Sequence, residues 1–391
     1  MERNKLVLAP EQQHFKEKTA NPTQSFGSGG EIKMLDGKIY VPCLRSGASE
    51  INALLTLPEE YKSLITPLIF LMGTDWAKIS NFITNYEYPL WLDSSRFKLD
   101  EEGIVNNELN NSSNNYVFKF EKYCELKLFN ENISPVITLN LADKPRELIK
   151  LVRSFKEHFN NVGLRIELTN DNYENILNLL DKVLLSFDAS DIENLTIFLD
   201  LGKINSGDQT DKEHVISFVS YIQNNLSPKN IITISTSFPA KPVGAIYQEC
   251  HDLIWHEILK EKVNTHNFIY GDYAATSPTD IIQVSKFMRP RPAATYLMDS
   301  LTWYIESQGK VQEYAKFVDI ANNIIKLDGY HGDDFCWSNT EIKRISNITD
   351  LTRKGYGGQQ QWNEYKIHQH ICAILHSKTN QEVVGETEEA W

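Results

Sequence analysis

Short apolar segments recur along the chain between residues 38 and 273, and a longer, more polar stretch separates each one from the next. The segments are rich in Ile, Val, Leu, Phe and Tyr, as strands buried on both faces are. We therefore expect eight buried strands, at residues 38–44, 66–72, 88–93, 134–141, 162–168, 195–201, 230–238 and 266–273.

Several of the intervening stretches have the periodicity of amphipathic helices. One carries Leu148, Leu151 and Phe155 at helical spacing, and Pro145 suits its first turn. Eight strands alternating with helices predict parallel βαβ units, and eight is the number that closes a (β/α)8 TIM-like barrel. A doubly wound open sheet is the rival, but no G-x-G-x-x-G motif follows the first strand to support it.

The expected domain organisation has three parts: a flexible N-terminal arm at 1–30, the α/β barrel at 31–286, and a mainly helical C-terminal extension at 287–391 that packs on the barrel. The Asn-rich stretch 96–133 interrupts the barrel pattern and predicts a decorated loop in place of a plain third helix.

Three finer predictions concern these irregular parts. Within the decorated loop, residues 116–129 alternate like a hairpin strand. In the C-terminal extension we expect two helices within 293–327 and a short strand near 367–375.

Four of the expected strands carry a carboxylate at or near their C-terminal end: Asp93, Glu167, Asp200 and Asp272. If the strands are parallel neighbours, these side chains meet at the C-terminal mouth, where barrel enzymes hold their chemistry. They could bind a divalent cation such as magnesium or calcium, or act as an acid–base pair.

Two basic residues accompany these acids. Arg45 follows the first strand and could contact an anionic substrate group. Arg165 shares a strand face with Glu167 and points into the barrel. A structural alternative therefore stays open, in which Arg165 neutralises Glu167 or Asp200 in an ion-pair network.

His368 and His370 form an H-x-H motif and would face the same way on a strand, which makes them weak candidates for metal ligands. The five cysteines include no C-x-x-C pair, so they predict neither a disulfide framework nor a zinc framework and fit a reducing cytoplasm. No apolar run is long enough to span a membrane. The net charge of −13 argues against nucleic acid as a general ligand.

The chain resembles the beta protein family. Residues 38–69, KIYVPCLRSGASEINALLTLPEEYKSLITPLI, are similar to the opening of that family, and further similarity follows at IFLDLG, TSFP, FIYGDYA, FCWSNTEI and the final W…H-x-H-I. The family is expected to be barrel-like and occurs in phages, prophages and bacterial defence loci. The resemblance implies a setting of phage–bacterium conflict and leaves the mechanism open.

Some positions match the family pattern and others depart from it. The matches include Glu50 and Tyr273, together with the strand-end residues Asp93, Asp200 and Asp272 and both histidines. Four departures are Arg45 for Lys, Phe70 for Glu, Thr295 for Arg, and Ser338-Asn339 for Gly-Asp. The loss of a Glu, an Arg and an Asp argues against an active enzyme.

Two functions follow from this sequence. The preferred one is a barrel that binds or senses a ligand in an anti-phage system, with an effector or a phage protein as its partner. The alternative is a hydrolase that acts on a phosphodiester, nucleotide or glycoside through the acidic mouth, an expectation that rests on fold analogy.

Overall fold

The structure is a computed structural model that describes residues 34–73, 75–95, 104–169, 172–204, 210–239, 244–263, 268–276, 290–352 and 354–388. The expected N-terminal arm and the beginning of the decorated loop lie outside these residues.

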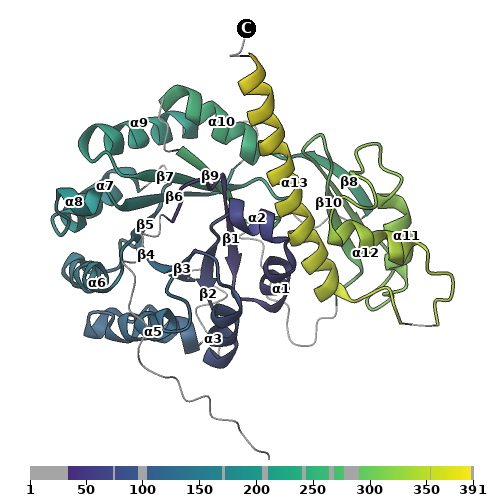
Figure 1. Cartoon of the computed structure of the whole chain (residues 1–391), viewed down its shortest axis with the longest axis horizontal. Helices are drawn as coiled ribbons and strands as arrows, with labels where there is room; N and C mark the ends of the chain where they lie inside the picture. Colours follow the sequence, from purple (N-terminus) through teal and green to yellow (C-terminus); the bar gives the residue numbers. More distant parts are fainter. Residues whose placement is uncertain are drawn as a thin grey trace, which may run out of the picture. The chain divides into compact units, whose positions relative to one another are not determined.

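Eight parallel strands close a barrel in the order β1-β2-β3-β4-β5-β6-β7-β9 (Figure 1). Each of the eight predicted apolar segments overlaps one of them, so the predicted (β/α)8 barrel is confirmed. The strands are β1 (Tyr40–Arg45), β2 (Leu68–Leu71), β3 (Leu90–Ser94), β4 (Ile133–Leu139), β5 (Val162–Glu167), β6 (Leu195–Lys203), β7 (Asn230–Thr236) and β9 (Phe268–Asp272).

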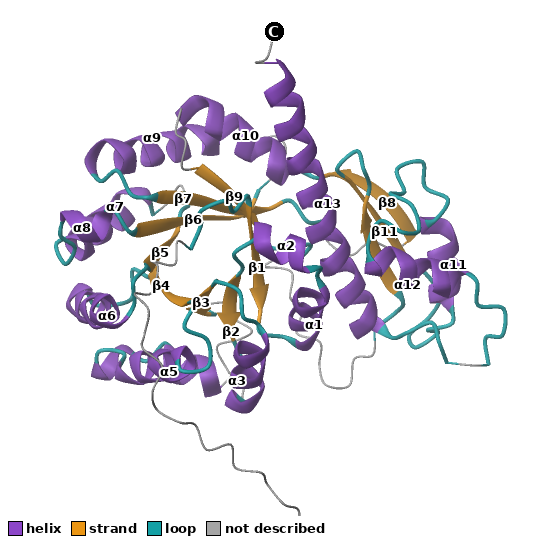
Figure 2. Ribbon diagram, viewed as in Figure 1, coloured by secondary structure: helices purple, strands orange, loops and turns teal. Residues whose placement is uncertain are grey.

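Helices surround this ring of strands (Figure 2). Helix α6 shows why: Leu148, Leu151 and Phe155 are buried on one face, and its exposed face is polar. The helices that lie between successive barrel strands in the sequence are α1 (Ala48–Thr56), α2 (Glu59–Leu64), α3 (Trp76–Asn85), α4 (Ile104–Leu109), α5 (Val117–Lys127), α6 (Pro145–His158), α7 (Tyr173–Leu184), α8 (Ala189–Ile192), α9 (Thr210–Asn225) and α10 (His251–Val263).

Alternation along each strand separates two apolar cores. On β1, Val41 and Cys43 belong to the cluster inside the barrel. Tyr40 and Leu44 belong to the larger cluster between the strands and the helices. The parity of a residue number along a strand therefore decides whether its side chain points into the barrel or toward a helix.

A three-stranded antiparallel sheet accompanies the barrel, in the order β10-β11-β8. It consists of β8 (Gly244–Glu249), β10 (Ala293–Leu297) and β11 (Thr302–Ser307). The chain leaves the barrel after β7, forms β8, and returns through α10 to β9. Residues 244–249 were expected within the barrel, but they pair with β11.

The C-terminal region is mainly helical, with α11 (Lys316–Ile324), α12 (Trp337–Ser346) and α13 (Gln359–Glu388). The prediction of two helices within 293–327 was wrong for its first half, which forms the β10–β11 hairpin. The hairpin residues are rich in Thr, Tyr, Trp and Ile, which favour strands, and Leu301 in its turn adopts a positive φ of 54°.

Helix α13 replaces the short strand predicted near 367–375. It packs against α1, α2 and β10, so it lies between the barrel and the appended sheet (Figure 1). Residues 367–375 are buried on every side of this helix. Because no side faces solvent, the sequence there has no apolar stripe at helical spacing, and the helix could not be recognised from it. No helix in the described part of the chain, α13 included, is long and apolar enough to cross a membrane.

The hairpin strand predicted at 116–129 is helix α5. Its inward face contains Lys119, Tyr123 and Leu126, spaced by four and three residues as a helix requires. The same letters also alternate at period two, which explains the incorrect prediction.

Candidate functional site

Arg165 is the centre of a charged network inside the barrel. Its side chain lies on β5 with no exposure to solvent. The guanidinium Nε donates to Asp93 Oδ2 on β3 at 2.9 Å, and Nη1 donates to Asp200 Oδ2 on β6 at 2.7 Å. The predicted ion-pair alternative is therefore present, and Arg165 joins two of the four predicted carboxylates.

Glu167 is the third predicted carboxylate in this network and the one that reaches solvent. Its Oε1 lies 3.0 Å from Arg165 Nη1, and its side chain is 49% exposed. Asp200, by contrast, is 3% exposed. The network thus runs from the dry interior of the barrel to the C-terminal mouth.

Asp93 is held as a carboxylate by several partners. Thr138 Oγ1 donates to its Oδ2 at 2.5 Å, and the ammonium of Lys119 lies 3.4 Å from its Oδ1. Burial alone would raise the pKa of Asp93, but the charges of Lys119 and Arg165 outweigh burial and lower this pKa below its ordinary value. Lys119 comes from α5, so the misassigned helix supplies a cation that sequence reasoning missed.

Tyr273 completes the network beside Asp200. Its hydroxyl donates to Asp200 Oδ2 at 2.6 Å, and the backbone N–H of Gly202 donates to Oδ1 at 2.9 Å. Burial and the negative charge of Asp200 raise the pKa of Tyr273 well above its ordinary value. The tyrosine is therefore a fixed hydrogen-bond donor to this carboxylate.

Phe70 packs against the guanidinium of Arg165. The Arg165 Cζ lies 4.8 Å from the centre of the Phe70 ring, and Tyr273 stacks on the same ring at 6.2 Å. Phe70 stands where the family pattern leads us to expect a glutamate. This departure thus removes one carboxylate from the immediate surroundings of Arg165.

Asp272, the fourth predicted carboxylate, belongs to a separate network on the outer face of the barrel. It accepts from the Tyr40 hydroxyl at 2.5 Å and the Tyr270 hydroxyl at 2.8 Å, and its Oδ2 lies 2.7 Å from His370 Nε2 on α13. The parity of β9 explains the separation, because Gly271 and Tyr273 point inward and Asp272 points outward. Burial tends to raise the pKa of Asp272, and His370 and the hydrogen bonds lower it.

Arg45 and Glu50 are both near the C-terminal end of β1 along the chain. Arg45 ends the strand, and Glu50 is in the first turn of α1. A carboxylate oxygen of Glu50 lies 2.6 Å from the position that a Cβ at Gly47 would occupy, so this side chain folds back over the start of the helix. Both residues are partly buried.

The H-x-H pair is divided by the helix that carries it. Two residues separated by two positions lie on different faces of a helix, so His370 turns to Asp272 and His368 turns to α12. There the Nδ1 atom of His368 lies 3.0 Å from Ser338 Oγ and 3.8 Å from Cys372 Sγ. The spacing of four between His368 and Cys372 is the only signal in the sequence that could have indicated this cluster.

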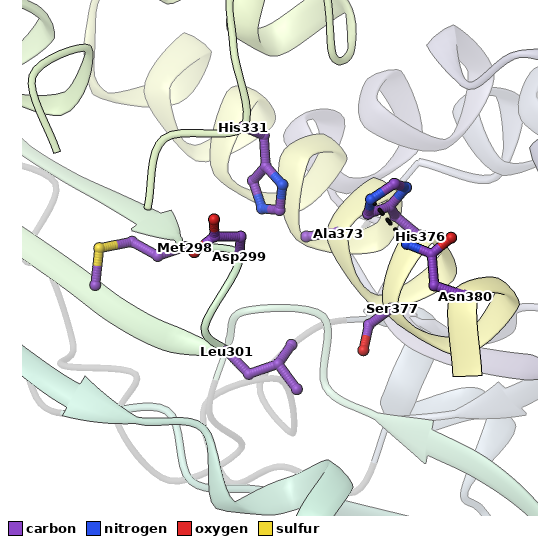
Figure 3. A pocket seen from close by; sticks show the side chains of 8 residues that line it. All are labelled: Met298, Asp299, Leu301, His331, Ala373, His376, Ser377 and Asn380. Carbon is purple, nitrogen blue, oxygen red and sulfur yellow. Dashed lines mark hydrogen bonds between the residues drawn. The ribbon is translucent and has the colours of Figure 1, made fainter. Parts of the chain in front are cut away.

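A cavity of about 500 Å³ lies between α13 and the turn that joins β10 to β11. Figure 3 shows the imidazoles of His331 and His376 on its walls. The volume suits a small molecule. The lining residues are Met298, Asp299, Leu301, His331, Ala373, His376, Ser377 and Asn380.

The family model described as Beta protein matches residues 40–376, from the first barrel strand into α13. The chain belongs to the Beta protein family. A member from Enterobacteria phage P4, named Protein beta, is 23% identical over 345 residues, which is 85% of this chain and 91% of that protein. The region that matches the Beta protein family thus includes the barrel, the appended sheet and the first part of α13.

Two solved structures show weak similarity. An AP endonuclease of family 2 from Brucella melitensis is 11% identical with a TM-score of 0.33, over 64% of this chain and 99% of that one. The enoyl reductase domain of MlnA from Bacillus amyloliquefaciens is 11% identical with a TM-score of 0.34, over 86% of this chain and 81% of that one. At these TM-scores neither structure indicates what this Beta protein family member does.

Proposed function

We propose that the protein is a binding and sensing barrel in conflict between bacteria and phages, and that it engages a protein partner at its C-terminal mouth. The observation that supports a binding role is the saturation of the interior carboxylates. Asp93 and Asp200 both accept from Arg165, and each has at least one further hydrogen-bond donor.

Acid–base hydrolysis requires a carboxyl group that is protonated near neutral pH, and enzymes obtain it by raising the pKa. At Asp93 the shift has the opposite sign, because Lys119 and Arg165 lower its pKa. To free either carboxylate, a substrate would have to break a buried ion pair, which costs several kcal/mol. This network therefore suits a rigid scaffold better than a proton-transfer site.

The mouth offers a carboxylate acceptor to a bound protein segment. The Glu167 carboxylate is half exposed. A protein segment that presents an N–H group or a cationic side chain could bind the exposed part of this carboxylate. The family membership and the phage relative support the biological setting.

The hydrolase alternative is favoured by one observation. Glu167 combines solvent exposure with a position at the C-terminal end of β5, where barrel enzymes hold reactive groups. A hydrolase acting on a phosphodiester, nucleotide or glycoside would use this carboxylate beside Arg165.

A single substitution separates the two functions. Glu167→Gln removes the exposed charge and keeps the side-chain shape, and the matched control Glu131→Gln changes another exposed glutamate at the opposite end of the barrel, before β4. Bacteria carrying the native locus are challenged with phage, and purified proteins are assayed for thermal unfolding and for cleavage of phosphodiester and glycoside substrates.

We expect Glu167→Gln to lower phage protection by roughly tenfold or more, as loss of one charged contact does. The melting temperature should fall only slightly, because Arg165 keeps its buried partners Asp93 and Asp200, and Glu131→Gln should behave as wild type. Turnover of a substrate by the purified wild type, abolished by Glu167→Gln, would instead establish the hydrolase. If Glu167→Gln protects bacteria as fully as the wild type does, the proposal that a partner binds at the C-terminal mouth is refuted.

A further inference from the structure

Two thiols and an imidazole meet where α12 approaches α13. Cys336 precedes the first turn of α12, and His368 and Cys372 come from α13. One ligand atom from each of the three residues lies within 4.8 Å of the other two. Among the residues that the structure describes, these three form the group of His, Cys, Asp or Glu side chains that could hold one metal ion.

We propose that Cys336, His368 and Cys372 bind a thiophilic divalent cation, with Zn²⁺ as the representative ion. A tetrahedral zinc site with Zn–S bonds of about 2.3 Å and a Zn–N bond of about 2.0 Å places its ligand atoms about 3.5 to 3.8 Å apart. The cluster needs only a small contraction to reach this geometry, and Cys372 Sγ already lies 3.8 Å from His368 Nδ1.

The positions of the ligands are fixed by two helices. His368 and Cys372 are four residues apart on α13, so they lie on one face of the helix and point the same way. Trp337 packs edge-on against the His368 ring at 5.3 Å and restricts its rotation. A site whose ligands are already oriented loses little conformational entropy when the ion binds.

Burial differs among the three ligands in a way that suits metal entry. His368 and Cys372 are fully buried, and Cys336 is only partly buried. The ion would enter from the Cys336 side, and water or the Ser338 hydroxyl, now 3.0 Å from His368 Nδ1, would complete the fourth position.

The chemistry of the donors selects the ion. Thiolate sulfur and imidazole nitrogen favour zinc and similar transition metals, whereas magnesium and calcium prefer oxygen ligands. Each thiol releases its proton when it binds the ion, and no electron is transferred. The bound ion would join α12 to α13 and so tie the appended helices to the helix that packs on the barrel.

The test uses the full chain, purified with a chelator and kept reduced by a phosphine. Zn²⁺ is titrated by calorimetry, and Co²⁺ is added as a spectroscopic probe of thiolate coordination. The variants are Cys336→Ser and Cys372→Ser, with Cys124→Ser on α5 as the matched control because it is also a partly buried thiol.

We expect one equivalent of Zn²⁺ with a Kd below about 1 µM. Cys336→Ser and Cys372→Ser should weaken binding on the order of 100-fold, and Cys124→Ser should leave it unchanged. The Co²⁺ complex should show thiolate charge-transfer absorption that disappears in the two ligand variants. No bound metal, or equal weakening by Cys124→Ser, would overturn the proposal.

A measurement on the wild type keeps the test valid if a variant does not fold. Zn²⁺ should protect Cys336 from alkylation, as followed by peptide mass spectrometry, and leave Cys124 reactive. If Cys336 and Cys372 instead form a disulfide on mild oxidation and Zn²⁺ neither binds nor prevents it, the cluster is a redox pair and the metal site is refuted.

Discussion

Arg165 concentrates the electrostatics of the barrel interior in one side chain. It is fully buried, and three carboxylates lie within 3.0 Å of its Nε and Nη1 atoms. A buried guanidinium is stable only while its counterions are present, and the counterions depend on it in the same way. Arg165 and its partners therefore stabilise the fold as a unit.

Arg165→Met should destabilise the protein by about 3 to 5 kcal/mol, because Asp200 would remain as a buried charge without a cationic partner and Asp93 would keep only Lys119. The matched control is Arg153→Met, which removes an exposed arginine from α6. Urea unfolding followed by circular dichroism measures both. A loss of less than about 1 kcal/mol for Arg165→Met would mean that this network contributes as little as a surface ion pair.

At the scale of elements, β9 closes the barrel between β7 and β1 and leaves no space at Gly271. A Cβ at this position would lie 2.8 Å from the Thr233 carbonyl oxygen and 3.0 Å from the Val41 carbonyl oxygen. Both obstacles are backbone atoms of the neighbouring strands, so they cannot move without opening the ladder.

Gly271→Ala should therefore cost about 1 to 3 kcal/mol of stability, the range for an overpacked core. The control is Gly355→Ala, whose Cβ would meet its nearest neighbour at an ordinary 3.5 Å. Differential scanning calorimetry should show a lower melting temperature for the first variant only. Equal melting temperatures would show that the strands next to β9 adjust more easily than the structure indicates.

The elements that could be predicted from the sequence are those whose pattern of apolar residues and length fit one kind of element. The barrel strands are continuous apolar runs because both faces are buried, and α6 has a clean helical stripe. Residues 116–129 satisfy both periods, and residues 367–375 satisfy neither because they are buried all round. The separation of Asp272 from the other acids required the register of β9, which no local pattern contains.

At the scale of the whole described molecule, the helix layer, the barrel and α13 meet around two buried carboxylates, Asp252 and Asp272. Asp252 on α10 faces Asp272 on β9 and His370 on α13. Burial and the charge of Asp272 raise the pKa of Asp252 to about 7, although Ser237 and His370 partly oppose them. The Cys250 thiol lies 3.8 Å from its Oδ2.

The raised pKa of Asp252 makes the folded protein less stable as the pH rises toward 7. Between roughly pH 4 and pH 7 the folded protein keeps a proton on Asp252 that the unfolded chain has released, so the contribution of this group falls by about 1.4 kcal/mol per pH unit as the pH rises. Asp252→Asn cannot titrate. The unfolding free energy of this variant, relative to that of the wild type, should therefore increase as the pH rises from roughly 4 to 7. A difference that stays constant with pH would refute the raised pKa of Asp252.

The ionisation state of Asp93 tests the central claim most directly, because a rigid ion-pair scaffold keeps this carboxylate charged beside Lys119 and Arg165, whereas a general acid at this position would be protonated near neutral pH. Carboxyl ¹³C NMR of Asp-labelled protein, assigned with Asp93→Asn, follows this group through a pH titration. The account predicts a midpoint below the ordinary aspartate value of 3.8. A midpoint above about 5 would mark a carboxyl with the raised pKa of a general acid and would contradict it.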